Sequence, residues 1–346
     1  MYPSDLHPNY GVFVRNFERD FPDKSIRITD KTVISGKSNG FKRLINYLRF
    51  FFDSVQKLRQ ENFDLVYVHF LQHSLIPLHF WKNKSGKKIV LNAHGTDILG
   101  QGILYRLLRK WNLSIFRKAD LVVVPSEYFV PKLEQFGVPT NRIEISPSGG
   151  INPQLFFPDL NSRNQLKNRI GYLGRIDKGK GVETLIRAFT QVPIENLQLE
   201  LAGPGAMIEE LKSLSQSLEV YDRIQFLGNI PQEKIREIFA RWDVFIFPSE
   251  LDESLGLVGL EAMACGLPVI GSGKGGMSTY LLDGENGIVF EPGDVIDLSK
   301  KILDFYVQNQ EFRLNLSTRA IAAANRYQAD RVNSKLRKRI QSFFHS

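Results

Sequence analysis

The chain has 346 residues, which is more than a single hydrophobic core usually contains, so its length predicts two domains. Its hydrophobic share of 42% and charged share of 24% are those of an ordinary soluble globular protein. The one cysteine, Cys265, excludes a disulfide framework. No apolar run approaches the ~20 residues that span a bilayer, and the first residues lack a signal-peptide pattern, so we expect a cytoplasmic protein.

Basic residues are concentrated in the first half of the chain. Residues 1–168 contain 24 Lys and Arg against 14 Asp and Glu, a net charge of +10. The remaining residues contain 21 and 23, a net charge of −2, and the two halves sum to the +8 of the whole chain. The first half is therefore expected to meet an acidic partner, such as an anionic lipid surface or nucleic acid. No nucleic-acid-binding module is recognisable, so we expect no nucleic-acid partner.

The first half alternates helix-like and strand-like stretches. Residues 41–60, FKRLINYLRFFFDSVQKLRQ, are predicted to form a helix with Phe41, Leu44, Ile45, Leu48, Phe52 and Val55 on one face. Such a stripe usually packs into a core. The surplus of Phe and the neighbouring cations also fit docking on an anionic membrane, together with residues 105–118, YRLLRKWNLSIFRK. Short runs rich in Val, Ile and Leu at 64–70, 87–94, 119–125 and 141–147 are typical of buried parallel strands.

The second half repeats this alternation. Strand-like runs lie at 169–174, 197–203, 222–228, 243–248 and 267–272, with a predicted helix at 182–192. The polar stretch 158–168 is predicted to be a linker between the two series of strands. We therefore predict an N-terminal domain over 1–165, a C-terminal domain over 166–328, and a basic amphipathic helix over 329–346 that packs back toward the first domain. Each domain is expected to be a doubly wound α/β sheet, with ligands at the carboxyl ends of its strands and in the cleft between the domains.

Two motifs follow strands of the second half. GRIDKGKG (174–181) offers the forked donor of Arg175 and the point charge of Lys180, with glycines that permit a tight loop around an anion. A solvated basic loop is the alternative. In ESLGLVGLE (253–261), two glutamates bracket small and apolar residues. The simple interpretation is an acidic first turn of a buried helix. The functional one places a diphosphate on a helix that begins near Leu255 or Gly256, with a carboxylate on each side to hold a sugar ring.

The order and spacing of these motifs resemble a known family. GRIDKGKGVETLIRAF, LAGPG, FLGNI and FPSELDESLGLVGLEAMACGLPVI are similar to segments of the retaining glycosyltransferases of family 4. ESLGLVGLE matches the E-x7-E signature of that family. YPSDLHPNYGVFVRNF, LNAHGTDI, VVPSEYFVPKL and ISPSGGINPQLFFP agree more loosely, so the resemblance extends over nearly the whole chain. It implies the GT-B fold, in which two Rossmann-like domains face each other across a cleft.

The resemblance also implies roles for individual residues. Arg175 and Lys180 bind the nucleotide diphosphate, and Glu253 holds hydroxyls of the donor sugar. The segment Ser254, Leu255, Gly256 and Leu257 contacts sugar and phosphate, and Glu261 takes the ribose hydroxyls. His94 is the active-site histidine beside the transferred sugar, although a single His is more often structural. Gly11 corresponds to the glycine loop on the acceptor side, where Asp97 of the AHGTD segment is also placed.

No metal or other cofactor is expected. Asp residues never recur two positions apart, so the D-x-D pair that holds a divalent metal in the other main glycosyltransferase fold is missing from the sequence. Arg175, Lys180 and the helix end are able to neutralise a departing diphosphate without one. Retention in this family is attributed to attack from the face that the nucleotide leaves, with a phosphate oxygen taking the acceptor proton.

One departure concerns the start of the sequence. Relatives carry a short apolar strand before the YPS segment, whereas here that segment begins at Tyr2. In a doubly wound sheet this strand is central, so we expect the true coding sequence to begin upstream of Met1.

The sequence thus predicts a retaining, metal-independent glycosyltransferase. The expected substrates are a nucleotide-diphosphate sugar and a sugar or lipid-linked acceptor, in the assembly of bacterial cell-surface polysaccharide (lipopolysaccharide) or glycolipid. The expected location is cytoplasmic, with peripheral membrane contact as an added possibility. Two alternatives stay open: a catalytically impaired relative that only binds nucleotide sugar, and a sugar-nucleotide epimerase of the same fold.

Overall fold

The chain folds into two compact units, Met1–Gly149 with Asp330–Ser346, and Gly150–Ala329. The computed structural model describes residues 2–5, 11–60, 62–82, 86–100, 102–158, 163 and 165–344. The division at residue 149 differs from the predicted boundary at residue 165. Part of the predicted linker lies outside the described residues, but Arg163 is buried in the second unit, where it donates to the carbonyls of Trp242 and Phe239 at 2.6 and 3.0 Å. The described part of this stretch is therefore anchored to the second sheet.

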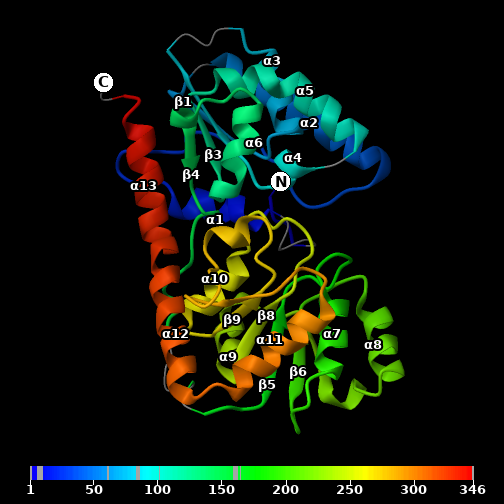
Figure 1. Ribbon diagram of the computed structural model, residues 1–346. Helices are drawn as coiled ribbons and strands as arrows, with labels where there is room; N and C mark the ends of the chain where they lie inside the picture. The colour runs from blue at the N-terminus through cyan, green and yellow to red at the C-terminus, as the bar shows by residue number, and fades with distance from the viewer. Residues whose placement is uncertain are drawn as a thin grey trace. The chain divides into compact units, whose positions relative to one another are not determined.

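The first unit contains a parallel sheet of four strands in the order β1-β2-β3-β4 (Figure 1). The strands are β1 (Leu65–His69), β2 (Lys88–Asn92), β3 (Leu121–Val124) and β4 (Ile143–Ile145). The helices are α1 (Val12–Asp20), α2 (Gly40–Gln60), α3 (Ile76–His79), α4 (Thr96–Leu99), α5 (Ile103–Lys118), α6 (Val130–Gln135) and α13 (Ala329–Gln341). Single 3₁₀ turns lie at His73–Leu75, Glu127–Phe129 and Thr140–Arg142. All four strands match predicted runs.

Alternate residues of these strands belong to two different cores. Ile89 and Leu91 of β2 pack in one core, and Val90 packs in the other together with Phe21, which follows α1, and Leu336 of α13. Helix α13 is held there by Arg337, whose guanidinium donates to the Phe21 carbonyl at 3.1 Å. Burial of both faces explains why the strand sequences are almost continuously apolar.

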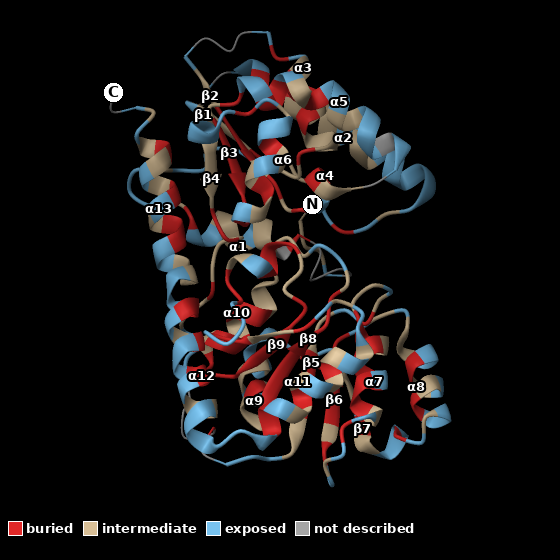
Figure 2. Cartoon of the chain, viewed as in Figure 1, coloured by how far each residue is buried: buried red, intermediate tan, exposed pale blue. Residues whose placement is uncertain are grey.

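Helix α2 shows where packing departs from the sequence pattern. The helix itself is confirmed, but Phe41, Leu44, Ile45, Leu48 and Phe52 are exposed, and only Val55 and Leu58 near its end are buried. The core-packing interpretation is therefore wrong for the first three turns of this helix. Figure 2 shows the exposed residues along α2 in pale blue.

The second unit contains a parallel sheet of six strands in the order β10-β9-β8-β5-β6-β7 (Figure 1). The strands are β5 (Arg169–Leu173), β6 (Gln198–Ala202), β7 (Ile224–Gly228), β8 (Val244–Phe247), β9 (Val269–Gly271) and β10 (Ile288–Val289). The helices are α7 (Val182–Thr190), α8 (Ile208–Ser217), α9 (Ile235–Arg241), α10 (Leu257–Ala264), α11 (Val295–Val307) and α12 (Gln310–Ala324). Turns of 3₁₀ helix lie at Tyr221–Arg223, Gln232–Lys234, Gly276–Thr279 and Asn325–Tyr327. Five strands match predicted runs, and the two-residue β10 was not predicted.

The order of these strands marks one position for a ligand. From β5 the chain builds outward through β6 and β7, then returns to the other side of β5 with β8, β9 and β10. Helices α7, α8 and α11 cover one face of the sheet, and α9, α10 and α12 cover the other. Because the connections diverge between β5 and β8, a crevice is expected at the carboxyl ends of these two strands. Both motifs singled out in the sequence follow these strands.

Candidate functional site

The loop after β5 is shaped by glycines. Gly179 and Gly181 have positive φ angles of 82° and 71°, which side chains other than Gly adopt only with strain. A Cβ on Gly181 would lie 1.8 Å from the carbonyl oxygen of Pro248, which follows β8. The two loops therefore approach each other more closely than any larger residue at position 181 permits.

This close approach brings Lys180 to Glu253. The Lys180 ammonium donates to Glu253 Oε1 at 2.6 Å, and the Ser249 hydroxyl donates to the same oxygen at 2.6 Å. The side chains of Lys180 and Glu253 are only 16% and 14% exposed. The backbone N–H of Glu250 also donates to the Gly179 carbonyl at 2.9 Å. Two residues that lie 73 positions apart thus form one charged pair at the carboxyl ends of β5 and β8.

Arg175 lies in the same loop but remains largely exposed. Its guanidinium pairs with Asp177 Oδ2 at 2.9 Å, and the other oxygen of Asp177 accepts the Ala206 N–H at 3.0 Å. The loop after β6 is attached to the loop after β5, because the N–H of Ile176 donates to the Pro204 carbonyl at 2.8 Å. The arrangement leaves the guanidinium at the surface, where it can reorient toward an anion.

Helix α10 begins beside the Lys180–Glu253 pair, at Leu257. Its N-cap is Gly256, with φ 81° and ψ 53°, and no side chain caps the helix. The Tyr280 hydroxyl donates to the Gly256 carbonyl at 3.0 Å, and Leu255 is buried, so the turn is fixed from both sides. The N–H groups of the first turn and the positive end of the helix dipole are what an anion requires. Ser254, in the same turn, is half-buried.

Glu261 lies one turn further along α10 and differs from Glu253. Its side chain is half-buried, and within the part of the chain that the structure describes no hydrogen bond or ion pair reaches its carboxyl group. Burial raises the pKa of Glu261 to about 7. Hydrogen-bond donors that bind to the Glu261 carboxyl group would therefore favour its ionised form and release a proton near pH 7.

In the first unit, His94 follows β2 and contacts a second histidine. The Nε2 atom of His94 lies 3.0 Å from Nδ1 of His69, the last residue of β1. Ring centroids of Phe13 and Phe70 lie 4.2 and 4.8 Å from that of His94. Burial lowers the pKa of His69 to about 3 and that of His94 well below its usual value. Both imidazoles are therefore neutral at pH 7, and one donates to the other.

Asp97 fixes the backbone around this histidine pair. Its carboxylate accepts the N–H of His94 at 2.9 and 3.0 Å and the N–H of Leu71 at 3.1 Å. Asp97 is buried, and this burial raises its pKa while the backbone donors oppose the shift. The loops after β1 and β2 are thus tied to one carboxylate. Gly11, the other predicted acceptor-side residue, has φ 73° and caps the start of α1.

Several residues of these clusters were missed by sequence reasoning. Asp177 and Ser249 were overlooked because their roles depend on loops that meet only in the fold. His69 had a detectable signal, since it is a polar ring at the carboxyl end of an apolar strand run. The ligand-binding and catalytic roles assigned to the predicted residues stay predictions.

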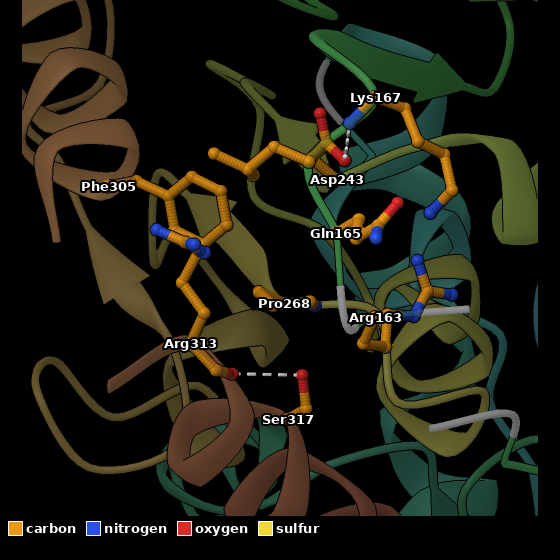
Figure 3. A pocket seen from close by; sticks show the side chains of 9 residues that line it. Arg163, Gln165, Lys167, Asp243, Pro268, Phe305, Arg313 and Ser317 are labelled. Carbon is orange, nitrogen blue, oxygen red and sulfur yellow. Dashed lines mark hydrogen bonds between the residues drawn. The ribbon is translucent and has the colours of Figure 1, made fainter. Parts of the chain in front are cut away.

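A separate pocket lies at the opposite ends of the strands in the second unit (Figure 3). Its lining includes Lys167, Asp243 and Pro268, which come just before β5, β8 and β9. The Asp243 carboxylate accepts the N–H groups of Lys167 and Arg169 at 2.8 and 2.9 Å and the Tyr306 hydroxyl at 3.0 Å. The Asp243 carboxylate is thus fully hydrogen-bonded and links the starts of neighbouring strands. We therefore assign this pocket a structural role and do not treat it as the candidate site.

Sequence comparisons identify the family of the chain. A family model described as "Glycosyl transferases group 1" matches residues 157–323, and one described as "Glycosyltransferase Family 4" matches residues 10–151. The chain belongs to the family 4 glycosyltransferases. The N-acetyl-alpha-D-glucosaminyl L-malate synthase of Bacillus anthracis is 29% identical over 276 residues, which are 76% of this chain and 70% of that protein.

A second family 4 relative is a mannosyltransferase. The GDP-mannose-dependent alpha-(1-6)-phosphatidylinositol monomannoside mannosyltransferase of Mycolicibacterium smegmatis is 30% identical over 239 residues, which are 64% of this chain and 62% of that enzyme. This match therefore spans less than two thirds of the relative's length.

Solved structures confirm the fold. HepE of Anabaena in complex with UDP superposes with a TM-score of 0.74 at 21% identity, covering 90% of this chain and 85% of that one. Sucrose-phosphate synthase of Thermosynechococcus elongatus gives a TM-score of 0.76 at 22% identity, covering 92% and 83%. The family 4 chain thus has the predicted GT-B fold, with two parallel-sheet α/β domains.

Proposed function

We propose that this protein transfers a sugar from a nucleoside-diphosphate sugar to a hydroxyl acceptor, with retention of configuration and without a metal ion. The observation that carries the proposal is the convergence of Lys180, Glu253 and the uncapped start of α10 at the carboxyl ends of β5 and β8. The names of its relatives support it, because one uses GDP-mannose and another transfers an N-acetylglucosaminyl group. A structural neighbour binds UDP.

The charges of the second unit suit a departing diphosphate. Lys180 uses one of its three N–H donors on Glu253, which leaves two for phosphate oxygens. Arg175 adds a forked donor and α10 adds free N–H groups. Groups fixed in place before the reaction stabilise developing charge most effectively. We therefore assign the role of a divalent cation to these residues.

Glu253 is better suited to holding a sugar than to attacking it. One of its oxygens already accepts from Lys180 and Ser249, so the carboxylate is fixed and its remaining lone pairs are available to sugar hydroxyls. We infer that the acceptor attacks from the face that the diphosphate leaves and that a phosphate oxygen takes its proton. His94 is assigned to a hydroxyl of the transferred sugar, as a neutral donor or acceptor.

The acceptor is proposed to be a sugar or lipid-linked molecule of cell-surface polysaccharide or glycolipid synthesis in the cytoplasm. One relative, whose name includes a phosphatidylinositol mannoside, supports a lipid-linked acceptor.

The proposal is tested by a thermal-shift screen of nucleotide sugars followed by a transfer assay. A ligand at a hundredfold excess over its Kd stabilises the folded state by about 2.7 kcal/mol, so the true donor is readily detected. We expect NMR of the product to show the anomeric configuration of the donor, and full activity in EDTA. Inversion of configuration, or loss of activity in EDTA with recovery in Mn²⁺, contradicts the mechanism. Binding without consumption of any donor favours the binding-only alternative.

Donor affinity is expected to depend on pH through Glu261. Ribose hydroxyls donate to the ionised carboxylate, so binding lowers the pKa of Glu261 from about 7 and releases a proton. Affinity should therefore be constant above pH 8 and fall as pH decreases below 7, roughly tenfold per pH unit at the steepest. Calorimetry with a nucleotide sugar measures this, because its diphosphate diester does not titrate in that range. Glu261→Gln should abolish the pH dependence; an unchanged slope in that variant removes Glu261 from the ribose site.

A further inference from the structure

Helix α2 presents an unpartnered apolar stripe. Phe41, Leu44, Ile45, Leu48 and Phe52 recur at the spacing of one helical face and are 42% to 76% exposed. The fully buried residues of α2, Val55 and Leu58, both lie near its end. Scattered exposed apolar residues are ordinary, whereas a continuous stripe of this length indicates an interaction surface.

Helix α5 carries a second stripe that is connected to the first. Ile103, Leu107 and Trp111 recur every four residues and are 71%, 60% and 48% exposed. Between the two helices, Phe51 of α2 contacts Phe80 with ring centroids 5.2 Å apart. The neighbouring residue of Phe80, His79, stacks on Trp111 at 4.5 Å. The two stripes and Phe80 thus form one surface, which we call the α2–α5 face.

Cations accompany both stripes. Helix α2 contains five Lys and Arg, among them the exposed Lys42, Arg43 and Arg49, and a single acidic residue, Asp53. Helix α5 contains five Lys and Arg, among them the exposed Arg106 and Lys110, and no acidic residue. Apolar residues flanked by cations on a helix are the pattern of segments that lie in the interface of an anionic bilayer.

We propose that the α2–α5 face docks the first unit on an anionic lipid bilayer. Phe, Leu, Ile and Trp side chains enter the boundary between headgroups and acyl chains, and Lys and Arg side chains lie at the level of the anionic headgroups. A second copy of this chain is a poorer occupant, because it brings exposed cations of one face, such as Lys42, Arg49 and Lys110, against those of the other. Among the described residues, no helix combines the length and the apolar composition of a membrane span.

The inference goes beyond the proposed transfer reaction and is tested without any sugar donor. The full-length protein is centrifuged with sucrose-loaded vesicles of phosphatidylcholine alone, or of phosphatidylcholine with 30% phosphatidylglycerol. We expect binding to the anionic vesicles at least about tenfold tighter, and strong weakening in 1 M NaCl, where the Debye length falls to about 3 Å. Equal binding to both vesicle types overturns the anionic specificity of the proposal.

Trp111 provides an optical signal of insertion. Trp81 and Trp242 are buried, so Trp111 is the exposed tryptophan among the three in the sequence. Anionic vesicles should shift its fluorescence to shorter wavelength, and Trp111→Phe should remove that shift while binding persists. A shift that survives in Trp111→Phe contradicts insertion of this face.

Matched variants locate the contact. Phe41→Ser with Phe52→Ser should weaken vesicle binding by about tenfold or more, because each removes a large apolar group from the interface. Ile296→Ser with Val307→Ser changes two residues of α11 in the other unit that are also exposed, at 71% and 69%, and should leave binding unchanged. Equal losses in both pairs overturn the assignment. Light scattering of the protein without vesicles measures its oligomeric state. If the protein is a dimer, and Phe41→Ser with Phe52→Ser converts it to a monomer, then a second copy of the chain covers the α2–α5 face and the lipid proposal is overturned.

Discussion

Replacing Lys180 by Ala is expected to lower the rate of sugar transfer at saturating donor by about a hundredfold or more. The ammonium is fixed by Glu253 at 2.6 Å and lies mostly out of solvent, where a charge acts on a leaving diphosphate with little screening. The substitution also leaves the Glu253 carboxylate, which is 14% exposed, with the Ser249 hydroxyl as its remaining described partner. Steady-state kinetics with the donor found by the screen provides the measurement.

Lys178→Ala is the matched control for this prediction. Lys178 belongs to the same loop and the same charge class, but its side chain is exposed and makes no described hydrogen bond or ion pair. Its removal changes the net charge of the protein equally and should alter the rate less than about threefold, because exposed charges are screened. Similar losses in the two variants mean that general electrostatic attraction of the donor, and not a fixed phosphate contact, explains the effect of Lys180.

Gly181→Ala is expected to damage both the stability of the second unit and donor binding. The new Cβ would lie 1.8 Å from the Pro248 carbonyl oxygen, and φ is 71° at this position. The two loops must separate to relieve the overlap, which breaks the placement of Lys180 against Glu253. We expect the free energy of unfolding to decrease by at least about 3 kcal/mol and the thermal shift on adding donor to disappear.

Gly284→Ala separates the two causes of this loss. Gly284 has the same φ of 71°, but a Cβ there meets no atom within 4 Å. Its substitution should cost only the backbone strain, about 1–2 kcal/mol, and should leave the donor-induced shift intact. If Gly181→Ala loses no more stability than Gly284→Ala and still binds the donor, close contact of the two loops is not required for the site.

Much of the fold of the second unit can be predicted from the sequence, because the patterns that indicate its strands and loops extend over only a few neighbouring residues. Continuous Val, Ile and Leu runs marked β5 to β9, and the glycines of 174–181 marked a loop that adopts positive φ. The same local signals predicted that Lys180, Glu253 and the start of α10 lie near one another, because parallel strands present their carboxyl ends at one edge of a sheet. The two residues of β10 were missed, since so short a strand has no detectable periodicity.

Glu253 and Glu261 have different environments that the local sequence does not predict. In sequence they are the equivalent ends of ESLGLVGLE, yet Glu253 is paired with Lys180 and Ser249, whereas burial raises the pKa of Glu261 to about 7. Their difference depends on Lys180, from the loop after β5, and on Ser249, from the turn after β8, which both reach Glu253. The contact between His69 and His94 depends in the same way on the parallel register of β1 and β2, which pairs His69 with Asn92.

The sequence by itself determined the alternation of strands and helices, the family and the position of the anion-suited loops, because each follows from periodicity and residue type over a few neighbours. Only the tertiary structure decided which charges are paired, which histidines touch and which apolar stripe stays exposed. The stripe of α2 has the pattern of a core helix, but an amphipathic pattern states only that a face is apolar. What covers that face depends on elements distant in the sequence, and no local signal carries that information.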